Sequence, residues 1–262
     1  MEHVSKAQIK LVRSLQQKKF RDELGLFVAE GEKCIEELRK AFELVYRIQS
    51  TEHSTQSDSL EASPKEIEQM SGLRTPQGVI GVFKKSTEHR IQRTDRLCLA
   101  LDGIQDPGNL GTIIRTCNWF GVHDIFCSKD TTDCYNPKVV QATMGALARV
   151  QVHYVDLAAW IKEQGSKTPI FGTLLEGKNM YEVLRSEREN GLKKVGVIVM
   201  GNEGNGISQA VRSLVTHAIR IPSYSQNGLS SPTETNVEAS EVIESLNVSI
   251  ATAIVLAEFR RE

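Results

Sequence analysis

Polar and small residues gather at three points of the sequence, each beside an apolar run. The first is LDGIQDPGNLGTIIR, residues 101–115, where an apolar run ends in an aspartate and an arginine lies inside a helix-like pattern. The second is VMGNEGNGIS at 199–208, and the third joins IRIPS at 219–223 to ESLNVSIA at 244–251. Glycine lets the backbone approach a ligand closely, and arginine offers a charged, planar fork of donors. The three stretches therefore suit ligand binding and the orientation of a reacting group.

Two common nucleotide-binding motifs do not fit the second stretch. Its glycines follow the spacing G-x-x-G-x-G, and no acidic residue lies at the offset of a dinucleotide fingerprint. The Gly-Lys-Ser/Thr ending of a phosphate-binding loop is also absent. In the third stretch, Ser245 and Asn247 by themselves fit ordinary helix caps, because both side chains can accept hydrogen bonds from helix N–H groups.

Alternating strands and helices surround these stretches. In the first part of the chain the pattern predicts a polar loop at 51–63, strands at 25–31, 42–50 and 78–85, and helices at 5–19, 32–41 and 63–73. Further on it predicts strands at 97–103, 124–129, 150–155, 169–177, 195–204 and 217–223, and helices at 109–120, 136–150, 157–165, 208–215 and 244–261. Short apolar strands separated by helices predict a mostly parallel sheet covered on both faces. In such sheets the ligand lies beyond the C-terminal strand ends.

Composition and cysteine use limit the possible classes of protein. The chain has 262 residues, of which 40% are hydrophobic and 25% charged, which suits one large globular domain or two modest ones. It has no apolar run of about 18 residues and no apolar signal core, so we expect a cytoplasmic protein with no membrane partner. Its five cysteines form no CxxC pair, which predicts buried free thiols and no metal site.

Basic residues cluster in two places although the net charge is only −1. Residues 1–21 contain six basic side chains against one acidic, and residues 84–96 contain five against two. Clusters of this kind fit phosphate contact and a solvated surface equally well.

Taken together, the three stretches resemble the SpoU family of RNA ribose methyltransferases, within the SPOUT superfamily. The first matches the form D-P-x-N-x-G-x-x-x-R, the second G-x-E-G-x-G, and the third I-P followed by E-S-L-N-V-S-x-A. This match covers residues 97–262. A weaker match, carried by GLFVAEG and TPQGVIGVF, relates residues 5–83 to the family's RNA-recognition domain.

The resemblance implies an α/β protein of two domains. Residues 97–262 would form a knotted SPOUT methyltransferase domain with a mostly parallel sheet and helices on both faces. Residues 1–83 would form a smaller α/β RNA-recognition domain, joined by a basic linker at 84–96. The resemblance further implies a C-terminal trefoil knot, a homodimer, and methyl transfer from S-adenosylmethionine to a ribose 2′-hydroxyl. Ribosomal RNA is the first expectation for the substrate, and transfer RNA is the second.

The resemblance also assigns roles to single residues. Arg115 is expected to hold the RNA phosphate or the 2′-oxygen. Asn109 and Glu203 are expected to fix the loops and Arg115, while Ser245 and Asn247 orient the acceptor or close the loop. The cofactor is expected at Gly201, Ile221 and Leu246, with Thr173 or Leu174 as a weaker addition. Because the sulfonium donor already carries a good leaving group, the catalytic contribution of these residues would be orientation and local electrostatics.

One stretch departs from the family pattern. Residues 224–242 separate the I-P string from E-S-L-N, and their polar composition predicts a mobile loop. Such a loop can be a lid over cofactor or RNA, or a tolerated surface insertion.

Three other functions stay open as alternatives. A base methyltransferase of the same fold is less favoured, because Asn109, Arg115 and the Ser-Leu-Asn string match the ribose branch of the superfamily. A non-catalytic RNA-binding relative is opposed by the intact Arg115, Glu203 and Asn247. A nucleotide-dependent oxidoreductase lacks its fingerprint.

Overall fold

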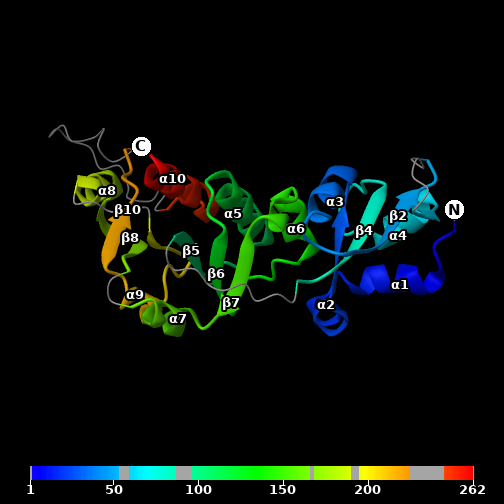
Figure 1. Cartoon of the computed structure of the whole chain (residues 1–262), viewed down its shortest axis with the longest axis horizontal. Helices are drawn as coiled ribbons and strands as arrows, with labels where there is room; N and C mark the ends of the chain where they lie inside the picture. Colours follow the sequence, from blue (N-terminus) through cyan, green and yellow to red (C-terminus); the bar gives the residue numbers. More distant parts are fainter. Residues whose placement is uncertain are drawn as a thin grey trace, which may run out of the picture. The chain divides into compact units, whose positions relative to one another are not determined.

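The computed structural model describes residues 2–52, 59–86, 96–165, 168–189, 195–224 and 245–261. The chain divides into two compact units, whose elements are labelled in Figure 1. Unit 1 comprises Met1–Gln92, Gln105–Ile125 and Thr131–His153, and unit 2 comprises Arg93–Ile104, Phe126–Asp130 and Tyr154–Glu262. The segment that carries the first motif therefore belongs to the same compact unit as the N-terminal part of the chain.

A four-stranded sheet forms the N-terminal part of unit 1. Its strands are β1 (Leu26–Glu30), β2 (Leu44–Ser50), β3 (Leu60–Ala62) and β4 (Val79–Lys84), in the order β1-β4-β2-β3. Strand β4 runs antiparallel to β1 and β2, and β3 runs parallel to β2. The loop predicted over 51–63 is wrong at β3, because these three residues pair with the end of β2 although their own sequence is a poor strand signal.

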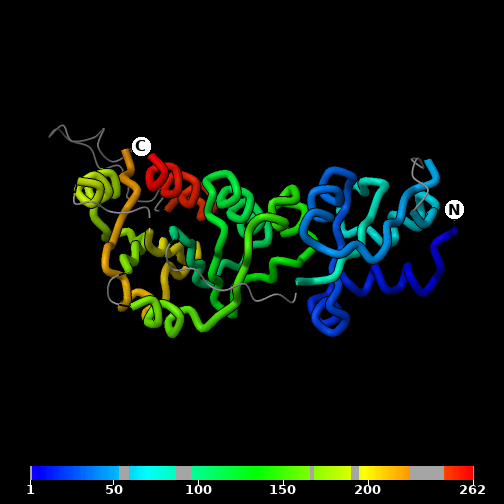
Figure 2. The backbone as a smooth tube through the Cα atoms, in the orientation of Figure 1, coloured from blue at the N-terminus to red at the C-terminus, as the bar shows by residue number. Residues whose placement is uncertain are grey.

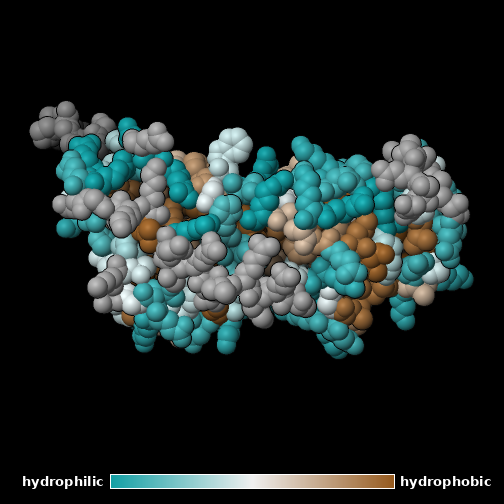
Figure 3. Space-filling model, viewed as in Figure 1, coloured by the Kyte–Doolittle hydropathy of each residue, from teal (hydrophilic) through white to brown (hydrophobic). Residues whose placement is uncertain are grey.

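Four helices accompany this sheet: α1 (Lys6–Ser14), α2 (Lys18–Leu24), α3 (Glu32–Leu38) and α4 (Pro64–Met70). The single helix predicted over 5–19 is wrong, since the chain breaks at Gln17, whose backbone is extended. The guanidinium of Arg21 donates to the carbonyl groups of Leu15 and Gln16, at 2.8 and 2.9 Å, and so holds the break. In α3, Cys34, Ile35 and Leu38 are buried as predicted, while hydrophilic side chains cover its outer surface in Figure 3.

A second, six-stranded sheet has the order β10-β8-β9-β5-β6-β7. Its strands are β5 (Leu97–Asp102), β6 (Asp124–Ser128), β7 (Gln151–Val155), β8 (Ile170–Asn179), β9 (Gly196–Gly201) and β10 (His217–Arg220). Strands β10, β8, β9 and β5 are mutually parallel, which confirms the mostly parallel sheet. Asp102 lies opposite Gly201, so β5 and β9 end at the same level.

Six helices follow the strands: α5 (Pro107–Trp119), α6 (Pro137–Thr143), α7 (Leu157–Glu163), α8 (Met180–Glu189), α9 (Gln209–Arg212) and α10 (Val248–Arg260). The trace in Figure 2 shows α5 and α6 side by side within unit 1. Helix α8 was not predicted. The helix predicted over 136–150 is too long: α6 ends at Thr143, its C-cap Met144 adopts a left-handed conformation at φ 51° before Gly145 at φ 85°, and a short 3-10 turn follows.

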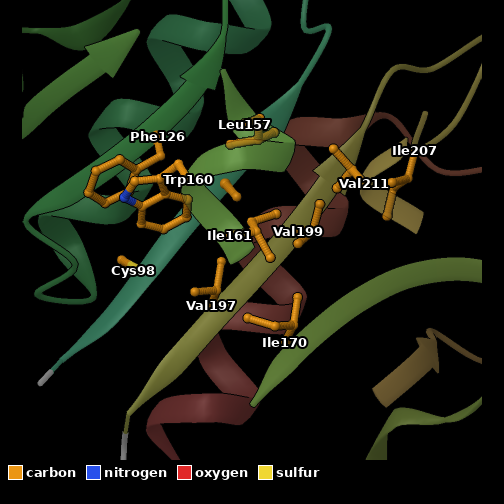
Figure 4. Packing of buried hydrophobic residues seen from close by; sticks show 11 residues of the cluster. Cys98, Phe126, Leu157, Trp160, Ile161, Ile170, Val197, Val199, Ile207 and Val211 are labelled. Atoms are coloured by element: carbon orange, nitrogen blue, oxygen red, sulfur yellow. The ribbon is translucent and has the colours of Figure 1, made fainter. Parts of the chain in front are cut away.

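The part of the six-stranded sheet that belongs to unit 2 is covered on both faces, as predicted. On one face Trp160 of α7 stacks on Phe126 with ring centroids 3.8 Å apart, within the apolar cluster of Figure 4. On the other, Phe171 of β8 meets Phe259 of α10 edge-on at 4.9 Å. Each fully buried side chain of this size contributes about 1.5–3 kcal/mol.

Several expectations fall outside this description. Of the 224–242 insert only Tyr224 is described, and residues 87–95 of the basic linker are not. The trefoil knot and the domain boundaries stay predictions. Among the described residues, no helix is long and apolar enough to cross a bilayer.

Candidate active site

Hydrogen bonds tie the ends of β5 and β9 together in unit 2. The buried carboxylate of Asp102 accepts from the backbone N–H of Ser208 at 2.7 Å. The Asn202 side-chain amide donates to the carbonyl of Gly103 at 2.7 Å, and the N–H of Gly103 donates to Ser128 Oγ at 2.8 Å. Asp102 and Asn202 were not among the expected site residues. Their positions, at a strand end and beside Gly201, were the signals that could have identified them.

The glycine-containing loop after β9 folds back on itself. Asn202 Oδ1 accepts from the N–H groups of Gly204 and Asn205 at 2.8 and 3.1 Å. The backbones of Asn202 and Gly206 exchange hydrogen bonds of 2.9 and 3.0 Å. A Cβ at Gly201 would collide with the backbone of Gly206 and Ile207, so only glycine fits there. The loop thus presents backbone where the resemblance expects the cofactor.

Glu203 and Asn247, which lie 44 residues apart, meet in unit 2. Asn247 Nδ2 and the N–H of Val248 donate to Glu203 Oε1 at 2.9 and 3.3 Å. Asn247 Oδ1 in turn accepts from the N–H of Ser249 at 3.0 Å, which makes Asn247 the N-cap of α10. A carboxylate at a helix N-terminus is stabilised by the helix dipole. The contact joins the second motif to the third, and Asn247 acts as a cap as well.

The expected cofactor-binding residues lie along neighbouring parallel strands or next to α10. Thr173 follows Gly172, which pairs with Val199, and its hydroxyl donates to the Val199 carbonyl at 3.0 Å. Leu174 packs against the apolar cluster of unit 2. Ile221, half-buried, directly follows β10. Ser245 and Leu246 precede α10 and are both exposed, Leu246 by 47%.

The first motif forms the start of α5 in unit 1. Asp106 is the N-cap, and its carboxylate accepts from the N–H of Asn109 at 2.8 Å. The helix begins at Pro107, two residues earlier than predicted. A Cβ at Gly111 would collide with Ala142, so glycine allows α5 to pack closely on α6.

Arg115 lies on the exposed side of α5, away from the buried Ile113, Ile114 and Cys117. Within the described part of the chain, no hydrogen bond or ion pair engages its side chain. Its charge is therefore available to a ligand. Arg115 and Asn109 belong to unit 1, whereas Glu203, Asn247 and the expected cofactor-binding residues belong to unit 2.

The cysteines follow the prediction of buried free thiols: all five are buried and unbridged. Burial raises the pKa of Cys34 to about 11, so its thiol stays protonated and unreactive near neutral pH. The described residues contain no group of three or more histidine, cysteine, aspartate or glutamate side chains that could hold a metal ion.

Comparison with known proteins relates both parts of the chain to RNA methyltransferases. The model of the SpoU rRNA Methylase family matches residues 96–231, and that of the MRM3-like substrate binding domain matches residues 6–81. The chain is 26% identical to 23S rRNA (guanosine(2553)-2′-O)-methyltransferase RlmP of Bacillus subtilis (strain 168), over 99% of this chain and 98% of that one.

Two solved structures are similar over almost the whole chain. One is a Porphyromonas gingivalis protein assigned to the TrmH family of RNA methyltransferases, with a TM-score of 0.78, 33% identity and 98% of each chain covered. The other is an AdoMet-bound rRNA methyltransferase from Sinorhizobium meliloti, with a TM-score of 0.77, 27% identity, and 99% of this chain and 96% of that one covered. Since the family model spans more than half of the sequence and its motifs form the loops described above, the chain belongs to the SpoU rRNA methylase family.

Proposed function

We propose that the protein transfers a methyl group from S-adenosylmethionine to a ribose 2′-hydroxyl of ribosomal RNA. The observation that carries this proposal is the contact of Glu203 with Asn247 and the N-terminus of α10, which joins two motifs that are distant in sequence. The 2′-O-methyltransferase RlmP, similar over the full length, supports the ribose as acceptor and ribosomal RNA as substrate.

The residues at the strand ends fit the cofactor. At Gly201 the backbone passes this edge without a side chain, because the tight turn that follows leaves no room for a Cβ. Leu246 exposes an apolar side chain that can cover part of a bound ligand. When bound, S-adenosylmethionine supplies an activated methyl group. The role of these residues is to bind it and to hold it in one orientation.

Arg115 is the residue that we assign to the RNA. Its guanidinium is charged and donates in a planar fork, which suits a phosphate beside the acceptor or the 2′-oxygen itself. Holding the hydroxyl in line with the methyl group converts an encounter between two molecules into a step within one complex. Asn109, near the start of the same helix, and the Glu203–Asn247 contact would keep the surrounding loops in place.

Helix α1 offers a surface for the rest of the RNA. Lys6, Lys10 and Arg13 share one exposed face, at intervals of four and three residues, opposite the buried Val12. None of the three pairs with an acidic residue in the described part of the chain. Other members of the basic stretch are used within the fold: Lys18 pairs with Asp22, and Arg21 is buried.

We further propose a homodimer. Trp119 at the end of α5 is 83% exposed, and Ile250 on α10 is 54% exposed. Single exposed apolar side chains also occur on monomers, so the support for the homodimer is the resemblance to the SpoU family. Transfer RNA stays the second candidate substrate, and a cytoplasmic location stays a prediction.

Methyl transfer to purified RNA tests the function directly. The full-length protein would be incubated with radiolabelled S-adenosylmethionine and with ribosomal or transfer RNA that lacks 2′-O-methyl groups. We expect label in ribosomal RNA at a nucleotide whose 3′ linkage becomes resistant to alkali. Label on a base, or cofactor binding without transfer to either RNA, would overturn the proposal.

A further inference from the structure

A buried ion pair joins α2 to the segment between β6 and α6 in unit 1. Arg21 Nη2 and Nε lie 2.8 and 3.0 Å from Asp133 Oδ2, and their side chains are only 2% and 9% exposed. Nη1 donates to the carbonyl groups that end α1, and Asp133 Oδ1 accepts from the N–H of Tyr135 at 3.0 Å. Both charged groups are thus fully engaged, which is the condition under which a buried pair is tolerated.

Tyr135, two residues after Asp133, packs among aromatic side chains. The ring of Tyr135 lies 4.8 Å from that of Phe27 and 6.2 Å from that of Phe42, measured between centroids. Its hydroxyl accepts from the N–H of Ser86 at 3.3 Å, and Lys85 Nζ lies 5.1 Å from the ring centroid. The segment before α6 is therefore embedded among residues of the N-terminal sheet.

The other end of α6 is held as well. Arg149 forms an ion pair with Glu37 of α3. Gly145, just after α6, lies so close to Glu37 that a Cβ would collide with its side chain. The segments before and after α6 are thus fastened to N-terminal residues, while α6 itself packs on α5, where Val139 and Ala142 lie close to Gly111. A continuous packed path runs from α2 and α3 to the helix that carries Arg115.

We infer that Arg21 and Asp133 are positioning residues for the RNA. Their ion pair fixes the N-terminal RNA-binding part relative to α5, and so determines which ribose reaches Arg115. In this arrangement a shift of either element would leave a charge unpaired in a dry environment, so the pair favours one arrangement over others. A recognition domain on a loose tether would instead bring several neighbouring riboses within reach. This inference rests on the proposed function.

The test compares two variants with a surface control. Arg21→Met removes the pair and leaves Asp133 buried. Arg21→Met/Asp133→Leu removes both charges and keeps apolar volume, which is the safer change for folding. Arg39→Met breaks the exposed ion pair with Glu36 and serves as the control.

Two activity measurements separate positioning from simple loss of structure. On a full-length ribosomal RNA substrate, we expect kcat/KM to fall about tenfold or more in the folded variants, and methyl groups to appear at neighbouring riboses. On a short RNA that carries only the target nucleotide, kcat should stay within about twofold of wild type. If Arg21→Met does not fold, the double variant decides. A folded double variant with unchanged kcat/KM and a single methylated nucleotide would overturn the inference.

A distance measurement between two spin labels tests the inference independently of the proposed function. Spin labels at Glu68→Cys on α4 and Lys138→Cys on α6, both exposed, report their separation within one chain when labelled protein is diluted into unlabelled protein. We expect a single narrow distance distribution in wild type and a broader one in the double variant. If wild type methylates no ribose, the proposed function fails, but this readout still applies. Equally broad distributions in both proteins would overturn the positioning role.

Discussion

Arg21 and Arg115 both belong to unit 1, but the structure uses their charges in opposite ways. Arg21 lies buried against Asp133 and two backbone carbonyl groups, so that every part of its guanidinium stabilises the fold. Arg115 lies on the open side of α5 and has no partner among the described residues. The comparison teaches that residue type alone does not assign an arginine its role: Arg21 holds the fold together, whereas Arg115 keeps its charge open to solvent. Breaking the Arg21–Asp133 pair should therefore lower stability, whereas removing the charge of Arg115 should lower methyl transfer.

The largest effect is expected from Asp133→Ala. The change leaves Arg21 buried without its partner, which should lower the free energy of unfolding by about 3–5 kcal/mol. Denaturant unfolding followed by circular dichroism measures this. Glu43→Ala, which removes the partner of Lys84 in an exposed pair, should change stability by less than about 0.5 kcal/mol. Equal effects of the two changes would contradict the distinction between the buried and the exposed pair.

Arg115→Ala, in contrast, should lower activity and leave stability unchanged. We expect methyl transfer to fall by about 10²–10³-fold, as when one preorganised donor is removed from an active site. Cofactor affinity and the thermal midpoint should stay near wild type, because the side chain is exposed and unpaired. Arg115→Lys should restore activity only in part, since the fork geometry is lost. Turnover, cofactor titration and thermal unfolding check these points, and near-normal turnover of Arg115→Ala would refute its assignment.

Glu203→Ala tests a residue of unit 2 that we expect to contribute both to stability and to activity. The change removes the acceptor for Asn247 and for the N–H of Val248, which should cost about 1 kcal/mol of stability. Because the same contact joins two motif loops, we expect turnover to fall by about tenfold. Glu176→Ala, which breaks an exposed ion pair with Arg212 in the same unit, is the matched control. Full activity of Glu203→Ala would show that the contact only caps α10.

The unpaired charges of α1 should affect RNA binding with little effect on stability. Replacing Lys6, Lys10 and Arg13 together by glutamine should reduce the slope of log K against log salt by about 2, because each phosphate neutralised on single-stranded RNA accounts for about 0.7 of that slope. Lys18→Gln, which removes a charge already paired with Asp22, should change the slope much less. Binding isotherms at several salt concentrations measure both. An unchanged slope in the triple variant would identify the α1 face as solvated surface.

The smallest effect is expected at high pH, beside the buried pair. Burial raises the pKa of Tyr135 above its usual range. The tyrosine is neutral in both states below about pH 10, whereas above that pH the unfolded chain loses the proton first. Stability should therefore decline as pH rises above about 10, and Tyr135→Phe should decline less steeply. Identical alkaline profiles for both proteins would show that Tyr135 does not titrate with unfolding.

Much of the fold followed from local pattern in the sequence. The strands of both sheets other than β3 and the mostly parallel character of the second sheet follow from apolar periodicity and turn chemistry. The stretches that hold Asp106, Gly201 and Asn247 stood out in the same way, since they lie at strand ends or helix starts, whereas the roles of their residues followed from the resemblance to the SpoU family. What these signals share is that their physical cause lies within a few residues of the chain.

Only the tertiary structure decided which side chains and backbone groups from distant parts of the sequence pair with one another. The break at Gln17 and the strand β3 depend on partners outside their own segments, namely the Arg21 guanidinium and β2. Residue type alone could not separate Arg21 from Lys6 or Arg115, because burial and pairing with Asp133, 112 residues away, determine its role. The meeting of Glu203 with Asn247 likewise arises from packing of separate elements. Local sequence determines backbone conformation over short distances, whereas the environment of a charge is determined by whichever elements fold around it.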